Sequence, residues 1–364
     1  MADFPAPDGP MIHKTFTSDS IIYSMPQNIM SSLKIARSLL RTATFLLLLL
    51  YLVIGMLIGL YISGSSLNTP DEIVELGVKF VVCGLIIALW YIFGSGLNDY
   101  ADYEIDKINL PKATDRPLIS GQADKPALLR VSLIAATLTI PLAASLSAWY
   151  IVIVLALLLL SVSYSIPPFS ISRRGGLAPL LLPLGYIILP FGLGMMLSSD
   201  DFTAKPVLLL TAAYYFHFIG RIILKDYRDV KGDKANGKMT FLLRHGNRSV
   251  CLVSAISITI STGLILVALN EYAYILRFGF VYLLFFGLVT LYETSKATRW
   301  SQQKPLLAAF GRTMTGITAL TILTLCNAIW GFSALEQVAM LVGILGVYTW
   351  SAQQASRYNT AQTR

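Results

Sequence analysis

The stretch T-F-L-L-L-L-L-Y-L-V-I-G-M-L-I-G-L-Y-I, residues 44 to 62, is an apolar run without one charged side chain. A helix needs about 20 such residues to cross the hydrocarbon core of a bilayer. Because lipid offers no hydrogen-bond partner to the backbone, a spanning segment must be a helix or part of a closed barrel. The apolar residues here are continuous rather than alternating, which favours a helix.

The rest of the chain is also rich in apolar residues and poor in charged ones. Of its 364 residues, 55% are hydrophobic and 13% are charged, and the mean hydropathy is +0.65. A soluble domain carries about twice that share of charged residues. The sequence therefore predicts an all-α fold, a polytopic transmembrane helical bundle of nine to ten spans, the last one short and interrupted by glycine. We expect the spans at residues 42–63, 73–97, 127–146, 148–165, 177–197, 206–224, 249–269, 273–293, 311–331 and 335–351.

The links between these spans alternate in length and charge. Lys and Arg gather in the longer links, which are residues 98–126, 166–176, 225–248 and 294–310. Since cytoplasmic loops carry an excess of Lys and Arg, we expect these links and the N-terminus on the cytoplasmic side of the cell membrane. The same bias accounts for the net charge of +8, so the charge gives no reason to expect nucleic acid as a partner.

Two tails are expected outside the transmembrane domain, which we place at residues 41–352. Residues 1–40 are polar and lack the basic-then-apolar order of a signal peptide. We expect this tail to end in an interfacial helix, Met30 to Arg41, whose basic side chains suit anionic membrane lipid. Residues 353–364 form the C-terminal tail.

The chain repeats one acidic segment. The first aspartate segment, N-D-Y-A-D-Y-E-I-D-K-I-N, runs from Asn98 to Asn109 after the second span. The second aspartate segment, D-Y-R-D-V-K-G-D-K-A-N, runs from Asp226 to Asn236 after the sixth. When the two are aligned without gaps, six positions are identical, and three of these are aspartates. Such a match is hard to obtain by chance in a chain so poor in charge, and the expected topology places both segments on one membrane face.

The spacing of these aspartates indicates a metal site. Positions i, i+3 and i+7 share one stripe of a helix, where like charges repel and a cation would neutralise them. Ligands that are all oxygen select a hard ion such as Mg²⁺, which completes its shell with water and substrate phosphate. Two Mg²⁺ ions between facing stripes would bind a diphosphate. The alternative is a set of solvated loop charges paired with nearby Lys and Arg. The six aspartates are Asp99, Asp102, Asp106, Asp226, Asp229 and Asp233.

Basic residues near both segments could stabilise negative charge on a departing diphosphate. They are Lys112, Arg116, Lys225, Arg228 and Lys231. A further basic link, Y-S-I-P-P-F-S-I-S-R-R from Tyr164 to Arg174, adds a tyrosine at a helix end and two arginines. Taken alone, this link is explained by the positive charge of cytoplasmic loops.

Together these residues resemble a known family. N-D-x-x-D-x-x-x-D after the second span, with D-x-x-x-D after the sixth, is similar to the paired motifs of the UbiA-type intramembrane prenyltransferases. T-D-R-P-L-I-S-G (Thr114 to Gly121), Y-S-x-P-P (Tyr164 to Pro168) and K-D-Y-R-D-V-x-G-D-K-x-x-G-K-x-T (Lys225 to Thr240) look like further family features. The likeness covers roughly residues 35–330.

The resemblance implies a bundle around a central cavity with a cytoplasmic cap, where both segments bind Mg²⁺ and the diphosphate of an isoprenoid donor. It implies a first metal site made of Asn98, Asp99, Asp102 and Asp106. A second metal site would be made of Asp229 and Asp233, with Asp226 beside them. The residues expected to hold or ionise the diphosphate are Arg116, Lys225 and Tyr164, with Asn98, Lys112, Arg173, Arg174 and Arg228 as further diphosphate-binding residues.

The chain departs from the family pattern at two places. After the Pro-Pro pair, Ser170 and Ser172 stand where many relatives carry a lysine. Residues 36–41, A-R-S-L-L-R, lack the Arg-Pro pair with which many members begin the first span. Both departures concern the acceptor more than the donor.

The function hypothesis is Mg²⁺-dependent transfer of a prenyl group from an isoprenoid diphosphate to a lipophilic acceptor of aromatic, quinone or tetrapyrrole type, within the membrane. One alternative is a membrane terpene cyclase that needs no acceptor. Another is a divalent-cation transporter. Transporters place their sites near the bilayer midplane, and no expected span carries Asp or Glu near its centre, which disfavours that alternative.

Overall fold

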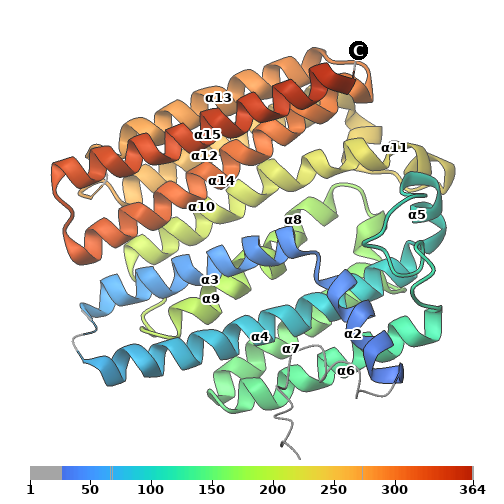
Figure 1. The fold of residues 1–364 in the computed structure, drawn as a ribbon, viewed down its shortest axis with the longest axis horizontal. Coiled ribbons are helices and arrows are strands. Elements are labelled where there is room, and N and C mark those ends of the chain that lie inside the picture. Colours follow the sequence, from blue (N-terminus) through green and yellow to red (C-terminus); the bar gives the residue numbers. More distant parts are fainter. Residues whose placement is uncertain (1–26, 66, 68, 273, 363–364) are drawn as a thin grey trace, which may run out of the picture.

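The computed structural model describes residues 27–362 except 66, 68 and 273, and from residue 351 onward it describes the backbone alone. The prediction for residues 1–26 lies outside this part. The described residues fold into a bundle of helices that lie side by side (Figure 1). The helices are α2 (Gln27–Leu40), α3 (Thr42–Ser63), α4 (Pro70–Ala101), α5 (Tyr103–Asn109), α6 (Lys125–Ala144), α7 (Ala148–Ser165), α8 (Leu177–Pro183), α9 (Leu189–Met195), α10 (Lys205–Ile222), α11 (Asp226–Ala235), α12 (Phe241–Ala268), α13 (Arg277–Lys296), α14 (Trp300–Trp330) and α15 (Ala334–Gln362).

The predicted all-α membrane fold is confirmed. Nine helical segments in the described part of the chain are long and apolar enough to cross a membrane, and they coincide with the first nine expected spans. Three of them begin clearly away from the expected residue, at Phe241 instead of 249, at Arg277 instead of 273 and at Trp300 instead of 311. The tenth apolar stretch, Ala334–Trp350, is shorter. It belongs to α15, which continues to Gln362 through most of the expected C-terminal tail, where Ala and Gln favour a helix.

Local sequence signals fix several helix ends. Thr69 caps α4: its hydroxyl accepts from the backbone N–H of Glu72, and the Glu72 carboxylate accepts from the backbone N–H of Thr69. Asp124 caps α6 with a single bond: its Oδ1 accepts from the backbone N–H of Ala127 at 2.8 Å. Prolines interrupt the fifth span, where α8 ends at Pro183 and a single π turn joins it to α9.

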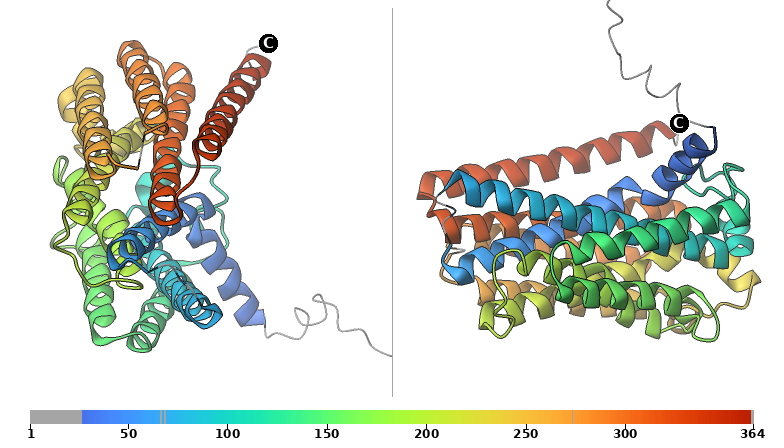
Figure 2. Two further views of the ribbon diagram at one scale, coloured as in Figure 1. Left: turned by 90° about the vertical axis from the view of Figure 1, so that its left-hand side faces the viewer. Right: turned by 90° about the horizontal axis from the view of Figure 1, so that it is seen from below.

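Glycines bring α3 and α9 into close contact at the centre of the bundle. A Cβ atom on Gly55 would lie 2.0 Å from the carbonyl oxygen of Phe191, and one on Gly194 would lie 2.0 Å from that of Leu52. Small residues allow this close backbone approach, which is a common way for membrane helices to associate. The end-on view of Figure 2 shows α3 and α14 toward the middle of the bundle and α15 on its outside.

The two aspartate segments meet at one end of the bundle. α4 leads into α5, and α10 leads through a short 3₁₀ turn, Ile223–Lys225, into α11. Figure 1 shows α5 and α11 next to each other at the same end, with α2 nearby. α2 occupies the place of the expected interfacial helix and packs Ile35 and Leu39 against α4 and α6.

Candidate active site

A cavity of about 550 Å³ opens between the two aspartate segments. We call it the aspartate cavity. Its lining comes from the ends of α4, α5, α7, α10 and α11 and from the link between α2 and α3. The predicted residues that line it are Asn98, Asp102, Asp106, Arg116, Tyr164, Lys225, Asp226, Arg228, Asp229 and Asp233.

The first aspartate segment does not form one continuous helix. The prediction that its three aspartates share one stripe of a single helix is therefore wrong. α4 ends at Ala101, Asp102 adopts φ −98° and ψ 14°, and α5 begins at Tyr103. Like charges at helical spacing disfavour a continuous helix, and Asp is favoured at helix boundaries. The backbone N–H of Asp106 still donates to the carbonyl of Asp102 at 2.8 Å, so both side chains reach the cavity.

The second aspartate segment does form the expected helix. α11 begins at Asp226 and carries all three aspartates, and each of them lines the cavity. Asp226 and Asp233 are buried, while Asp229 is half-buried and pairs with Arg228 at 2.9 Å. The second stripe is therefore presented to the cavity by a single element.

Arginines hold the first segment. Arg116 bridges two carboxylates: one guanidinium nitrogen pairs with Asp99 and lies 3.3 Å from Asp106. Arg41 pairs with Asp99 from the other side. Asp99 itself is 2% exposed and lies behind the lining of the cavity rather than in it.

The sequence prediction missed three basic residues that line the aspartate cavity, namely Arg221 and the two that pair with aspartates, Arg41 and Lys238. Arg41 joins α2 to α3 in the left-handed region, with φ 40°, a conformation that is costly for a residue with a side chain and persists where the surroundings impose it. The Nζ atom of Lys238 lies 3.5 Å from Asp102 and 3.7 Å from Asp233. Lys238 thus joins the two aspartate segments by charge.

The two asparagines that end the aspartate segments both bond to Gly232 of α11, but only Asn109 joins α5 to α11. Asn109 accepts at Oδ1 from the backbone N–H of Gly232 at 2.6 Å, and Asn236 donates from Nδ2 to the carbonyl of the same glycine at 2.9 Å. A Cβ atom on Gly232 would lie 2.7 Å from the Asn109 side chain. A glycine is therefore required where the first segment contacts the second.

Charge and burial prepare the aspartate cavity for cations. Burial raises the pKa of Asp106 to about 6, Arg116 opposes this, and the neighbouring carboxylates of Asp99 and Asp102 add to it. Burial acts to lower the pKa of Lys238, but Asp102 and Asp233 outweigh it, so that pKa is raised. The charged forms of Asp106 and Lys238 are thus both stabilised by a neighbouring group of opposite charge.

The carboxylates suit Mg²⁺ in their chemistry. Asp99 Oδ2, Asp102 Oδ1 and Asp233 Oδ1 are buried without a hydrogen-bond partner, and hard cations prefer such oxygen ligands. Among the described residues, no three His, Cys, Asp or Glu side chains converge closely enough to enclose an ion on their own. A site without three converging ligands suits Mg²⁺, because this ion is usually bound by one or two carboxylates and completes its coordination shell with water and substrate phosphate.

Aromatic side chains extend the cavity into the apolar bundle. A narrow space of about 50 Å³ adjoins it, and both spaces share Tyr91 and Tyr186. Trp90 lies 5.8 Å from Tyr186, and Phe218 stacks on Tyr186 at 5.3 Å, both measured between ring centroids. Apolar aromatics in a membrane bundle are mostly packing residues, so no sequence pattern singles out these four.

The comparisons with known proteins agree with this arrangement. A sequence model of the UbiA prenyltransferase family matches residues 48–314. The chain belongs to the UbiA prenyltransferase family. The predicted family membership is thereby confirmed.

The chain is similar to proteins with two different names. Chloroplastic chlorophyll synthase from Arabidopsis thaliana is 30% identical over 219 residues, which is 57% of this chain and 54% of that protein. Digeranylgeranylglyceryl phosphate synthase from Sulfurisphaera tokodaii is 26% identical over 242 residues, 66% of this chain and 82% of that protein. The chain thus matches about half the length of the plant relative.

Solved structures of UbiA homologues share the fold. A homologue from Archaeoglobus fulgidus superposes with a TM-score of 0.56 at 17% identity, covering 80% of this chain and 98% of that one. The same homologue bound to DMAPP and Mg²⁺ gives a TM-score of 0.56 at 18% identity, covering 82% and 99%. α15 lies beyond the residues that match the UbiA family.

Several predicted residues lie outside the aspartate cavity. Lys112, Arg173 and Arg174 do not line it, and Arg174 donates to the backbone carbonyls of Pro168 and Phe169 at 3.0 and 2.7 Å. These three residues remain predicted diphosphate ligands without support from the geometry. Lys231, another of the basic residues near the segments, is exposed and does not line the cavity either, while the other predicted side chains gather within or directly behind the cavity lining.

Proposed function

We propose that this protein transfers a prenyl group from an isoprenoid diphosphate to a lipophilic acceptor within the membrane, with Mg²⁺, and releases diphosphate. The observation that supports this most is the meeting of two duplicated aspartate segments in one cavity that continues into an aromatic, apolar space. Solved homologues bind DMAPP or GPP together with Mg²⁺. We further propose that the aspartate end of the bundle faces the cytoplasm, in keeping with its Lys and Arg.

Two Mg²⁺ ions are proposed, one at each aspartate segment. Asn98, Asp102 and Asp106 would hold the first ion, with Asp99 behind them, and Asp229 and Asp233 would hold the second, with Asp226 beside them. When bound, Mg²⁺ supplies positive charge to the diphosphate oxygens. Lys238 lies between the two segments, and we expect bound metal to take over its part in neutralising Asp102 and Asp233.

The protein's own groups then assist departure of the diphosphate. Arg116, Arg228 and Lys225 lie at the cavity and stabilise the charge that develops on the leaving oxygen. Tyr164 accepts a hydrogen bond from the Lys225 ammonium at 2.9 Å, which aims that ammonium into the cavity. We infer that Lys225 is oriented by Tyr164 rather than by a carboxylate, which leaves its charge for the substrate.

The reaction balances as a substitution at the first carbon of the prenyl group. The bond from that carbon to the diphosphate oxygen breaks, and its electron pair stays on the diphosphate. The acceptor supplies the electron pair of the new bond and loses a proton to water. Until that bond forms, the apolar space around Tyr91, Trp90 and Tyr186 keeps water away, and the ring faces can stabilise the cationic carbon.

Diphosphate release tests this proposal. The full-length protein in phosphatidylcholine nanodiscs would be given prenyl diphosphates of several chain lengths with a panel of lipophilic acceptors, in Mg²⁺ or in EDTA. We expect release of diphosphate and a prenylated acceptor in Mg²⁺ alone. Activity that persists in EDTA, or in Asp102→Ala or Asp233→Ala, would contradict the metal assignment. A cyclic hydrocarbon formed from donor alone would identify a terpene cyclase instead.

A further inference from the structure

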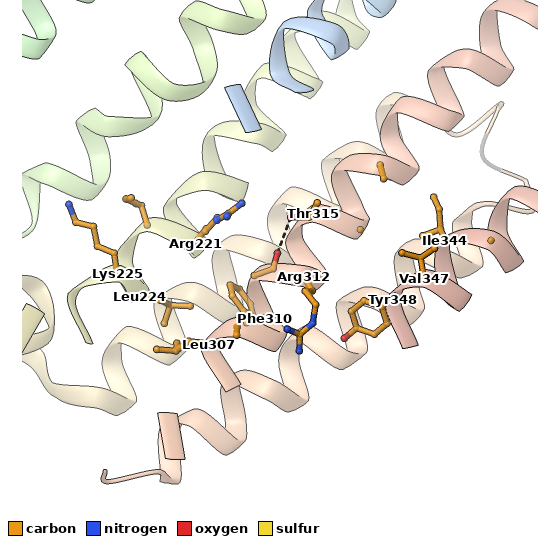
Figure 3. Close-up of a pocket in the computed structure, with 16 residues that line it drawn as sticks. Arg221, Leu224, Lys225, Leu307, Phe310, Arg312, Thr315, Ile344, Val347 and Tyr348 are labelled. Atoms are coloured by element: carbon orange, nitrogen blue, oxygen red, sulfur yellow. Dashed lines mark hydrogen bonds between the residues drawn. The ribbon is translucent and has the colours of Figure 1, made fainter. Parts of the chain in front are cut away.

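A second cavity adjoins the aspartate cavity on the side of α15. It has a volume of about 820 Å³ and lies between α10, α14 and α15, and we call it the α15 crevice (Figure 3). Arg221, Ile222 and Lys225 of the α10 end line both cavities. A molecule in the α15 crevice can therefore reach the side of the aspartate cavity where Lys225 lies.

Small and apolar residues make the crevice wide enough for a bulky molecule. Gly311, Gly316 and Ala319 of α14 line it together with Gly343 of α15. The remaining lining is mostly apolar, from Leu224, Leu307, Phe310, Ile344 and Val347. Such a surface suits the apolar part of a lipid-soluble substrate.

α15 is held in place by contacts that do not fill the crevice. The Tyr348 hydroxyl lies 2.9 Å from the Thr313 hydroxyl of α14. The Tyr348 ring packs 6.2 Å from Phe286 and 6.5 Å from Tyr282 of α13, between centroids. The position of α15 is thus fixed relative to α13 and α14, and the crevice is a defined space.

The charges that line the crevice are all positive. Its charged lining residues are Arg221, Lys225 and Arg312, with no carboxylate among them. Arg221 Nη1 and Arg312 Nε are buried and lack a hydrogen-bond partner. Within the part of the chain that the structure describes, neither guanidinium forms an ion pair, whereas Arg41, Arg116 and Arg228 all pair with aspartates.

The side chains of Arg221 and Arg312 are both half-buried, and a guanidinium that lacks an ion-pair partner within a membrane bundle indicates a missing anion. Arg221 and Arg312 both belong to spanning segments, Lys205–Ala235 and Trp300–Trp330. Arg221 also borders the aspartate cavity, but Arg312 lines the crevice alone, where no carboxylate could hold the metal ions of the donor, so the donor diphosphate is not the anion for Arg312. The planar guanidinium fork fits a phosphate or a carboxylate on another molecule.

We propose that the acceptor is an amphiphile with one acidic head group, which enters through the α15 crevice. Its apolar body lies between α14 and α15, and Arg312 and Arg221 bind its head. This inference rests on the proposed prenyl transfer and specifies the chemical class of the acceptor. It also gives α15, which lies outside the residues that match the family, a part in substrate selection.

The test compares two probes that differ only in the head group. A 1-acyl-glycerol 3-phosphate and the matching monoacylglycerol, each with a diazirine in the acyl chain, are added to the full-length protein in phosphatidylcholine nanodiscs. After irradiation, mass spectrometry locates the label. We expect the phosphate probe to label α14 and α15 about 10-fold more than the neutral probe at equal membrane concentration. Excess unlabelled 1-acyl-glycerol 3-phosphate should abolish the difference.

Arginine variants sharpen the test. Arg312→Gln and Arg221→Gln should each lower labelling by the phosphate probe about 10-fold, while labelling by the neutral probe, which reports the folded crevice, stays unchanged. Arg248→Gln, an exposed arginine of α12 that lines neither cavity, is the matched control and should behave like the wild type. If a variant fails to fold, the wild-type comparison of the two probes still decides.

Several outcomes would overturn the inference. Equal labelling by both probes would show that the crevice does not select an acidic head. If labelling by the phosphate probe stays undiminished in both arginine variants, Arg312 and Arg221 do not bind the head group. Competition by phosphatidylglycerol as strong as by 1-acyl-glycerol 3-phosphate would make the crevice a site for bulk anionic lipid. Because this test measures binding alone, loss of prenyl transfer counts against the proposed function and not against the crevice.

Discussion

The two aspartate segments are nearly the same in sequence but are built differently. The first is divided between α4 and α5 at Asp102, and arginines from elsewhere in the chain hold it in place. The second lies on one helix, α11, and its exposed pair is internal, between Arg228 and Asp229. Repeated sequence therefore does not give repeated structure, because the neighbours of each segment decide how its charges are balanced.

The difference has a consequence for function. The first segment depends on Arg116 and Arg41, whereas the second depends on its own helix and on Lys238. Loss of a carboxylate should damage both segments alike, since both are proposed to hold metal. Loss of a basic partner should damage the first segment more.

The largest effect is expected from the carboxylates that face each other across Lys238. Asp102→Asn and Asp233→Asn should each lower the rate of diphosphate release about 10³-fold, because each removes charge that holds a proposed Mg²⁺ worth several kcal/mol in the transition state. Equal losses in the two variants would indicate that two metal ions contribute equally to the rate of diphosphate release. Glu104→Gln, an exposed residue of α5 that pairs with Lys107, is the control and should keep full activity. A large loss in Asp102→Asn alone would reduce the site to one metal.

Arg116 should come next. Arg116→Gln leaves Asp99 and Asp106 without their shared cation, and we expect a loss of about 10²-fold in kcat, in the range for removal of one positioned donor. Arg116→Lys should recover only part of this loss, because one ammonium does not reproduce the guanidinium fork. Arg130→Gln, exposed on α6, is the control. Full activity in Arg116→Gln would show that the first segment needs no arginine.

The sequence allowed the fold and the donor side of the site to be predicted, because both follow from local patterns. Continuous apolar runs require helices in lipid, and aspartates at i, i+3 and i+7 of two similar segments indicate one cation site. The break at Asp102 could not be predicted, since Asp99 and Asp106 keep helical spacing whether or not the helix continues.

Residues whose role depends on distant partners were beyond prediction. Arg41 precedes the first span like any positive residue at a membrane boundary, and only the fold places it beside Asp99. Lys238 belongs to the family motif that runs from Lys225 to Thr240. Its position in that motif does not indicate that its ammonium lies between Asp102 and Asp233. The α15 crevice is hidden in the same way, because its lining combines α14 and α15 with the end of α10, which is far from them in sequence.

Lys238 should give a smaller effect that depends on metal. Lys238→Gln leaves Asp102 and Asp233 to repel each other, and we expect a loss of about 10-fold in kcat/KM at low Mg²⁺, as for supporting residues of metal sites. Raising the Mg²⁺ concentration should restore activity, since the ion supplies the charge that lysine gave. Lys234→Gln, exposed on α11, should show no such dependence. A loss that Mg²⁺ does not relieve would place Lys238 on the substrate instead.

The smallest expected effect is a difference in stability between variants of the two matching asparagines, Asn109 and Asn236. Asn109→Ala removes the acceptor for the N–H of Gly232 and with it the contact between the segments, a change that costs about 1–3 kcal/mol when the donor stays buried. Asn236→Ala removes a bond within α11 only and should cost about 0.5–1.5 kcal/mol. The apparent melting temperature in nanodiscs should therefore fall further for Asn109→Ala, and Gly232→Ala should match it, because its Cβ atom would collide with Asn109. Equal shifts for both asparagines would mean that α5 and α11 are joined by Lys238 and the aspartates alone.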